Sequence, residues 1–311
     1  MDRMSPNGVK ARTGDEVAIR TAACVCCALL LVLMAAPASL RADEHPDWTT
    51  PIAPFRIADN LYYVGSRDLA SYLVVTTAGD ILINSSLASS PALIRRSVEQ
   101  LGLHLSDIHV LLISHAHYDH DAGSYEMKRM TGARYMVMDF DVPVVESGGA
   151  KDFFYPHDAY PPASVDRVLH DGDEVRLGGS VLVAHKTAGH TRGCTTWTMR
   201  TTQQGKPVNV VIVGSWNVNP GYRLVSRPGK PTSYPGIADD YRKTFAVLKS
   251  LSCDIFLGAH GQYFDMLAKL ARANAGAGES VWIDPEGYRK AVAEKEREFE
   301  AELQRQERGG T

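Results

Sequence analysis

Four side chains that commonly bind metal ions lie close together in the first half of the chain. His115, His117, Asp119 and His120 fall within six residues and follow the apolar run 108–113 after a single serine. A short run of this kind is typical of a buried strand, so the cluster begins where a strand ends. His115 and His117 are two positions apart and can point to the same side of an extended turn. Asp119 and His120 can then point in a second direction. Imidazole and carboxylate ligands at this density favour a zinc site over a chance histidine-rich loop.

Polar residues also follow three later strands, which are predicted over residues 181–185, 208–213 and 255–257. In chain order these residues are His190, Ser215 and His260. Strand ends at one edge of stacked sheets converge, so the later histidines are expected to meet the first cluster. Two-metal hydrolases hold their ions about 3.5–4 Å apart. The six candidate ligands of such a pair are His115, His117, Asp119, His120, His190 and His260.

The elements that must position these residues follow an order of strands, helix, strand and helix that occurs twice. Strands are also predicted over 61–64, 71–77, 81–84, 134–138, 174–177 and 195–199. Helices are predicted over 90–101, from 121 to about 131, over 238–251 and over about 286–306. This order indicates an α/β protein of two αβ halves, packed sheet against sheet with the helices outside. The segments 146–166 and 216–236 are predicted to be long loops, which are usually functional or mobile.

Composition limits the class of protein. The chain has 311 residues, of which 44% are hydrophobic and 22% charged, and its formal net charge is −3. These values are typical of a globular protein with one large domain or two small ones. The slightly acidic balance gives no sign of a nucleic-acid partner.

The N-terminus has the pattern of an export signal. A polar segment with several arginines precedes an apolar run over residues 22–36, which is short for a membrane-spanning helix. Small residues suited to cleavage end at Ala38 and at Ala42. The alternative is an uncleaved anchor. The sequence therefore predicts that residues 1–42 are removed, that residues 43–311 form a single domain, and that this domain is periplasmic without stable membrane association.

The cysteines do not form a disulfide framework. Three of the five lie in the segment that is predicted to be removed, which leaves Cys194 and Cys253. Two cysteines are too few to staple a domain of this size, and whether they pair stays open. Cys194 lies only four positions after His190, and it is predicted to be a small buried residue.

The pattern His115-x-His117-x-Asp119-His120, followed by His190 and His260, resembles the metallo-β-lactamase superfamily. Four segments are most similar to its subclass B3. They are residues 114–123, 165–173, 189–197, and 220–224 together with 240–245. The similarity extends over essentially the whole chain after the export signal.

The resemblance implies a four-layer αββα sandwich with two zinc ions in one metallo-β-lactamase domain. His115, His117 and His190 would hold the first zinc, and Asp119, His120 and His260 the second. A zinc-bound hydroxide, oriented by Asp119, would then attack the β-lactam amide bond of penicillins, cephalosporins and carbapenems. The substrate would be a small molecule, and the protein is expected to be a monomer that confers antibiotic resistance.

The resemblance also implies which residues would recognise the substrate. Glyoxalase II and many lactonase or nuclease relatives place a metal-bridging aspartate where this chain has Ser215, and subclass B1 enzymes place a cysteine there. In subclass B3 relatives a hydroxyl here and a second one two positions later help to anchor the substrate carboxylate. The second position is Asn217 in this chain, which departs from that pattern but can still donate a hydrogen bond. The loop 148–164 resembles the family's flap, in which Phe154 would cover the substrate or pack the loop down, and Tyr222 would line the opposite wall.

Two other functions compete with β-lactam hydrolysis. One is a di-metal lactonase or thioesterase of the same superfamily with little β-lactamase activity. The other is a metal-binding protein without catalysis, against which the complete set of six ligands argues.

Overall fold

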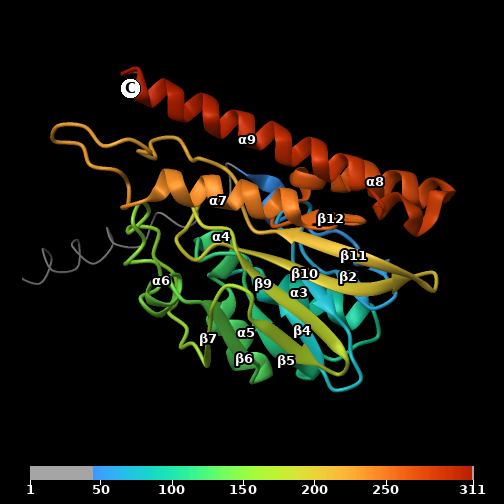
Figure 1. Cartoon of the computed structure of the whole chain (residues 1–311). Coiled ribbons are helices and arrows are strands. Elements are labelled where there is room, and N and C mark those ends of the chain that lie inside the picture. The colour runs from blue at the N-terminus through green and yellow to red at the C-terminus, as the bar shows by residue number, and fades with distance from the viewer. Residues whose placement is uncertain (1–44, 310–311) are drawn as a thin grey trace, which may run out of the picture. The chain divides into compact units, whose positions relative to one another are not determined.

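The first seven strands within the described part of the chain form one mixed sheet. The computed structural model describes residues 45–309, and Figure 1 shows how its elements are arranged. In order across the sheet the strands are β1 (Phe55–Ala58), β2 (Leu61–Tyr63), β3 (Tyr72–Val74), β4 (Asp80–Ile83), β5 (Ile108–Leu112), β6 (Arg134–Met138) and β7 (Arg167–Leu169). Strands β1 to β4 run antiparallel, whereas β4 to β7 run parallel.

The five later strands of residues 45–309 form a second sheet. Its order is β12 (Ile255–Gly258), β11 (Lys206–Val213), β10 (Thr195–Gln203), β9 (Ser180–Lys186) and β8 (Glu174–Leu177). The neighbours from β8 to β11 are antiparallel, and β12 pairs with β11 in parallel. Two sheets from two successive parts of the chain confirm the predicted pair of αβ halves.

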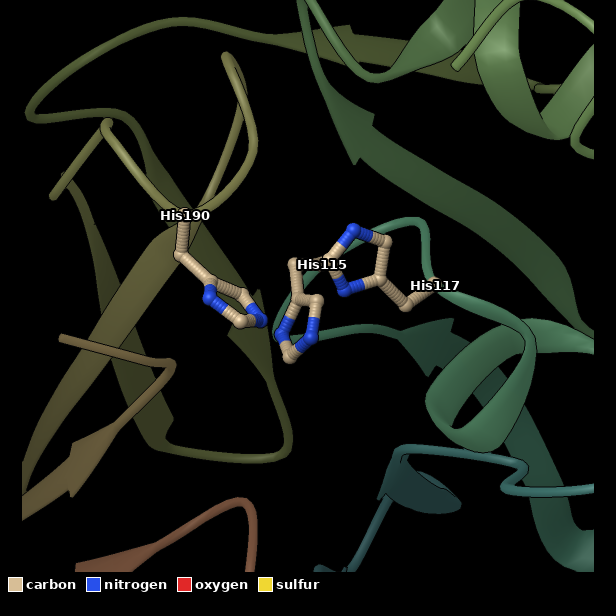
Figure 2. A group of neighbouring side chains, drawn as sticks. All are labelled: His115, His117 and His190. Atoms are coloured by element: carbon tan, nitrogen blue, oxygen red, sulfur yellow. The ribbon is translucent and has the colours of Figure 1, made fainter. Parts of the chain in front are cut away.

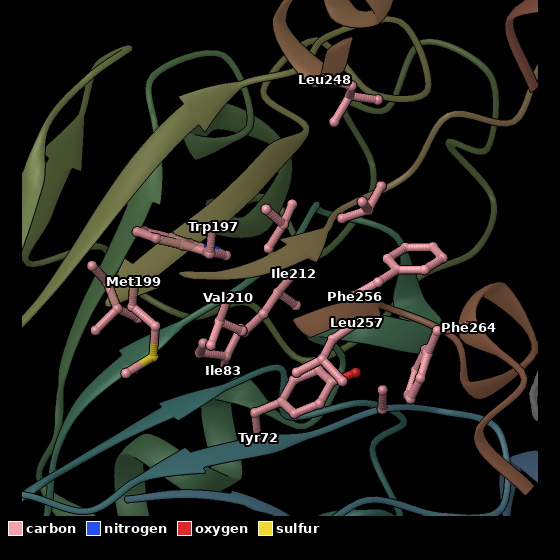
Figure 3. Close-up of a cluster of buried hydrophobic side chains, with 14 of the residues drawn as sticks. Tyr72, Ile83, Trp197, Met199, Val210, Ile212, Leu248, Phe256, Leu257 and Phe264 are labelled. Atoms are coloured by element: carbon pink, nitrogen blue, oxygen red, sulfur yellow. The ribbon is translucent and has the colours of Figure 1, made fainter. Parts of the chain in front are cut away.

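The main hydrophobic core lies between the two sheets. Alternate residues of β4 explain this, because Ile81 and Ile83 join the cluster between the sheets whereas Leu82 joins a second cluster on the outer face. Figure 3 shows Tyr72 and Ile83 facing Trp197, Met199, Val210 and Ile212 of the other sheet. Both faces of the central strands are therefore buried, which accounts for their continuous apolar sequence.

Helices cover the outer faces. On the seven-stranded sheet, α3 (Pro91–Gln100), α5 (Ser124–Thr131) and α6 (Val142–Glu146) contribute to the outer cluster. On the five-stranded sheet, α7 (Ile237–Ser250) and α9 (Pro285–Glu307) pack their apolar side chains into the main cluster (Figure 1). The remaining short helices of residues 45–309 are η1 (Pro46–Trp48), η2 (Leu105–Asp107), α4 (Tyr118–Asp121), η3 (Gly261–Phe264), α8 (Met266–Arg272), η4 (Ala273–Ala277) and η5 (Gly278–Trp282). The layers are helices, sheet, sheet and helices, so the predicted αββα sandwich is confirmed.

The structure differs from the sequence prediction at the short helices. The predicted helices 90–101, 238–251 and 286–306 match α3, α7 and α9 to within one residue at each end. The extended turn predicted for His115 and His117 agrees with the structure at His117, but the sequence prediction omitted α4, which begins directly after His117. His117 is extended, and the acidic Asp119 and Asp121 lie in the single turn that follows. Negative charge in a first turn is favourable near the positive end of a helix.

Hydrogen bonds tie the ends of the strands across the two sheets. The Trp197 indole Nε1 donates to the Ile113 carbonyl at 3.0 Å, and the Thr195 amide donates to the Ser114 carbonyl at 2.8 Å. The Tyr72 hydroxyl donates to the Gly258 carbonyl at 2.7 Å. These bonds bring the loops after β5, β9 and β12 to one edge of the sandwich.

The predicted export signal and its cleavage sites lie outside the described residues. Within residues 45–309, none of the helices combines the length and the apolar character needed to cross a membrane.

Candidate metal centre

The loop after β5 is held by its backbone. The Ser114 amide donates to Asn84 Oδ1 at 2.7 Å, and the Ala116 amide donates to Asp141 Oδ2 at 3.0 Å. Asp141 also accepts from the Thr191 hydroxyl at 2.8 Å and from the Gly193 amide at 2.8 Å. One buried carboxylate thus joins the loop that carries His115 and His117 to the loop that follows His190, in the other half of the sandwich.

Three buried histidines meet at this junction. One ligand atom from each of His115, His117 and His190 lies within 4.8 Å of the others. Figure 2 shows the three rings turned toward a common point between the two halves of the sandwich. The His190 Nδ1 lies 2.9 Å from the Asn217 carbonyl, to which it must donate. Its Nε2 therefore carries a lone pair that is free to bind a metal.

A second set of donors adjoins the first. Asp119 Oδ2 and His120 Nε2 are 3.2 Å apart, and His260 Nε2 lies 3.2 Å from the His120 nitrogen and 3.6 Å from the Asp119 oxygen. Neighbouring ligands on a tetrahedral zinc, with bonds of about 2.0–2.2 Å, lie about 3.3–3.6 Å apart. His115 also lies within 4.8 Å of Asp119 and His120, so it borders both sets. The residues present therefore fit two adjacent metal ions.

His260 is oriented by a carboxylate that sequence reasoning did not single out. Its Nδ1 donates to Asp68 Oδ2 at 2.9 Å, which leaves Nε2 as the metal-facing atom. The Trp48 indole at 3.2 Å and the Gln262 amide at 3.0 Å also donate to this carboxylate. Burial acts to raise the pKa of Asp68, but its hydrogen bond and charge attraction with His260 outweigh burial and lower that pKa.

Burial keeps the histidines in the form that binds metal. It lowers the pKa of His117 to about 4 and that of His190 to about 3, and it lowers the pKa of His115 well below 6.5. For Asp119 burial acts in the opposite direction, but the neighbouring His120 and His260 hold its pKa well below the usual range. Near neutral pH the first set therefore offers neutral imidazoles, while Asp119 adds a negative charge to the second.

The two residues predicted to anchor a substrate carboxylate share a partner. The Ser215 hydroxyl lies 3.2 Å from the Tyr263 hydroxyl, and Asn217 Nδ2 donates to that same oxygen at 3.0 Å. Ser215 is buried, whereas Asn217 is half-buried. Ser215, Asn217 and Tyr263 therefore form one polar cluster beside His260. Their contact with substrate stays a prediction.

The predicted flap residue Phe154 and wall residue Tyr222 contact each other. Their ring centroids are 4.7 Å apart, and a side-chain carbon at Gly221 would lie 2.8 Å from the Phe154 ring. Tyr222 is only 2% exposed, and its hydroxyl donates to the His190 carbonyl at 2.8 Å. The structure thus places Tyr222 where it supports a candidate ligand and places Phe154 where it packs the flap down. Their predicted contacts with substrate remain untested.

The two cysteines after the predicted export signal are not among the candidate ligands. Cys194 is buried, as predicted, and its Sγ lies 3.6 Å from the Ser215 carbonyl. Cys194 and Cys253 are both free thiols.

Sequence reasoning missed Asp68, Asp141 and Tyr263. Asp68 and Asp141 lie in loops after strands of the first sheet, whereas Tyr263 lies in η3, three residues after His260. Only the last had a usable signal, because a tyrosine so close to a predicted ligand is a natural candidate for the same site.

Comparison with known proteins agrees with this geometry. The sequence model of the Metallo-beta-lactamase superfamily matches residues 67–260. The chain belongs to this superfamily. The metallo-beta-lactamase FEZ-1 from Legionella gormanii is 50% identical with a TM-score of 0.80, and the match covers 84% of this chain and 98% of that one. The class B3 di-zinc metallo-beta-lactamase LRA-12 from an Alaskan soil metagenome is 35% identical with a TM-score of 0.74, over 82% of this chain and 96% of that one. The predicted similarity to subclass B3 is thereby confirmed.

Curated relatives match a smaller part. A hydroxyacylglutathione hydrolase from Methylobacterium sp. (strain 4-46) is 36% identical over 95 residues, which is 30% of this chain. The chain spans only 29% of the length of that relative. Similarity to the β-lactamases thus extends over far more of the chain, and for FEZ-1 the identity is also higher.

Proposed function

We propose that this protein is a zinc-dependent β-lactamase that opens the amide ring of penicillins, cephalosporins and carbapenems. One observation carries the proposal. Six candidate ligands meet in two adjacent sets, in a chain that is 50% identical to the metallo-beta-lactamase FEZ-1 across 98% of that chain.

The two sets would each hold one zinc ion. His115, His117 and His190 would hold the first. Zinc supplies a hydroxide near neutral pH and polarises a carbonyl oxygen. Asp119, whose low pKa keeps its carboxylate charged, would accept a hydrogen bond from the attacking water and orient it.

The other residues bind and shield the substrate. Ser215, Asn217 and Tyr263 present hydroxyl and amide groups beside His260, which can donate hydrogen bonds to a substrate carboxylate. The Tyr155 ring stands against that of His117 and would form an apolar wall there, with Phe154 packed behind it. Ser215 stands where the family resemblance places a metal-bridging aspartate in glyoxalase II relatives, which favours a β-lactam over a thioester.

We further propose that the protein acts in the periplasm. The support is the apolar run over residues 22–36 that is followed by small residues at Ala38 and Ala42. Its occurrence in a periplasmic fraction, without the export signal, would test this.

A single assay tests the function. The purified chain from residue 43 onward, supplied with zinc, is expected to hydrolyse a carbapenem, and a strong chelator should abolish this turnover. Asp119→Ala removes a candidate zinc ligand itself. It should lower kcat by more than the about 10–100-fold loss that is typical when a residue hydrogen-bonded to a ligand is removed. The exposed Asp47→Ala serves as the control and should leave kcat unchanged.

The same preparation should be tested with a hydroxyacylglutathione thioester and with a lactone. Turnover of either one alone would replace our proposal with the alternative hydrolase. Two bound zinc ions without any hydrolysis would indicate a metal-binding protein.

A further inference from the structure

Two buried polar atoms face each other at the base of the flap. His117 Nε2 and Asp152 Oδ2 lie 3.7 Å apart, beyond hydrogen-bonding distance. Each is fully shielded, and within the described residues neither has a hydrogen-bond partner. Buried polar atoms without partners are rare and costly, so the pair requires a physical reason.

The carboxylate of Asp152 is fixed by its own loop. Its other oxygen, Oδ1, accepts from the amides of Phe154 and Tyr155, each at 2.7 Å, and its own amide donates to the Gly149 carbonyl at 2.9 Å. These bonds close a tight turn and direct Oδ2 toward His117. The Tyr155 ring also stands edge-on to the His117 ring, with centroids 5.2 Å apart.

The orientation of His117 determines which of its nitrogens can bind a metal. Figure 2 shows one ring nitrogen turned toward His115 and the other turned away. The nitrogen that faces Asp152 is Nε2, so Nδ1 is the atom left to join His115 and His190. A metal-bound imidazole is deprotonated at the bonded nitrogen, and its second nitrogen then carries a hydrogen that needs an acceptor.

We propose that Asp152 is a positioning residue that accepts this hydrogen when a metal occupies the three-histidine set, and so couples the flap to His117. This rests on the proposed zinc centre. A shift of about 1 Å closes the gap to a charge-assisted hydrogen bond. The flap also contacts Tyr222, whose hydroxyl holds the His190 carbonyl, so it supports two of the three histidines.

The test measures zinc binding by each of the two sets of candidate ligands separately. In a His260→Ala background only the three-histidine set is complete, and in a His190→Ala background only the set of Asp119, His120 and His260 is complete. Asp152→Asn keeps the oxygen that closes the loop turn and replaces Oδ2 with an amide that cannot accept. Zinc dissociation constants are measured by competition with a chromophoric chelator.

Asp152→Asn is expected to weaken zinc binding about 10- to 100-fold in the His260→Ala background. It should leave zinc binding in the His190→Ala background unchanged. Asp158→Asn removes a carboxylate from the same loop and is expected to change neither constant.

Amide hydrogen exchange supplies a readout that does not depend on activity. Zinc should increase the protection of the Phe154 and Tyr155 amides in the parent more than in Asp152→Asn, while the two metal-free proteins exchange alike. Equal zinc affinity of parent and variant in the His260→Ala background would overturn the positioning role. A parent that binds zinc but lacks β-lactamase activity would refute only the proposed function, whereas a parent that binds no zinc would refute both.

Discussion

The side chain of His260 owes its orientation to one carboxylate, whereas that of His190 owes it to a backbone carbonyl. Asp68 accepts from His260 Nδ1, and the Asn217 carbonyl accepts from His190 Nδ1. Both bonds select the tautomer whose Nε2 can bind a metal. Only the first can be removed by a substitution without moving the main chain, which makes Asp68 the more direct test of how the ligands are oriented.

Asp68→Ala is expected to weaken zinc binding by the set of Asp119, His120 and His260 about 10- to 100-fold. The loss arises because His260 can then rotate or adopt the other tautomer. Chelator competition in the His190→Ala background measures it. Asp47→Ala removes an exposed carboxylate that pairs with Arg67, next to Asp68, and should have no effect. Equal affinity of the Asp68 and Asp47 variants would contradict the orienting role.

The zinc content of the three-histidine set should resist mild acid. Protons compete with a metal only below the pKa of the ligand, and burial lowers the pKa of His117 to about 4 and that of His190 to about 3. Affinity is therefore fully present above these values and is lost as the pH falls through about 4. Atomic emission analysis of the His260→Ala protein, equilibrated at fixed free zinc between neutral pH and pH 4, checks this. Half-release near pH 6.5 would show that the histidines titrate as free imidazoles.

At the scale of elements, the site depends on loops that are joined across the two sheets. Asp141 follows β6 of the first sheet and accepts hydrogen bonds from residues after β9 of the second. It also accepts from the Ala116 amide, between two candidate ligands. Burial raises the pKa of Asp141 to about 6, which shows that the carboxylate is kept there at an energetic cost. The benefit is a fixed distance between the loops of His117 and His190.

Asp141→Ala leaves three buried donors without an acceptor. Each costs about 1–3 kcal/mol, and part of this is recovered because the buried charge is also removed. The free energy of unfolding is expected to fall by about 3 kcal/mol, as measured by urea denaturation of the metal-free protein. Asp139→Ala, two residues earlier, breaks a partly exposed pair with Lys186 and an exposed hydrogen bond from the Phe140 amide, and it should cost under about 1 kcal/mol. Equal losses in the two variants would mean that Asp141 does not join the loops.

Sequence patterns predicted the strands and the meeting of the six candidate ligands for a physical reason. Apolar runs mark buried strands. His260 comes two residues after β12, which is buried throughout, and His190 comes four residues after β9, which is buried at alternate residues. The residues that hold the ligands in place left no such trace. Asp68 and Asp141 act through hydrogen bonds to residues 192 and 50 positions away, respectively, and no local pattern encodes these pairings. The helical turn after His117 was also missed, because four residues are too few to show helical periodicity.

On the scale of the whole molecule, the last turn of α9 reaches the loop beside the site. Gln306 is buried there, and its Nε2 donates to the Tyr222 carbonyl at 2.7 Å while its Oε1 accepts from the Leu224 amide at 2.7 Å. Tyr222 in turn holds the His190 carbonyl. A helix at the C-terminal end of the described residues therefore supports His190, a candidate ligand near the middle of the chain.

Gln306→Ala is expected to lower the free energy of unfolding by about 1–3 kcal/mol, because the Leu224 amide loses a buried acceptor. It should also weaken zinc binding by the three-histidine set, since the Tyr222 loop becomes less restrained. Gln304→Ala, an exposed position on the same helix, is the matched control. If the Gln306 variant loses stability but keeps its zinc affinity, α9 stabilises the fold without supporting the metal centre.

The two free thiols bear on where this protein can fold. Cys194 is sealed inside the sandwich against the Ser215 carbonyl, and Cys253 has no disulfide partner within residues 45–309. The described fold is therefore not held together by any oxidised bond. A reducing cytosol and an oxidising export compartment should therefore yield the same fold of residues 45–309, and neither oxidants nor disulfide isomerases should limit the formation of that fold.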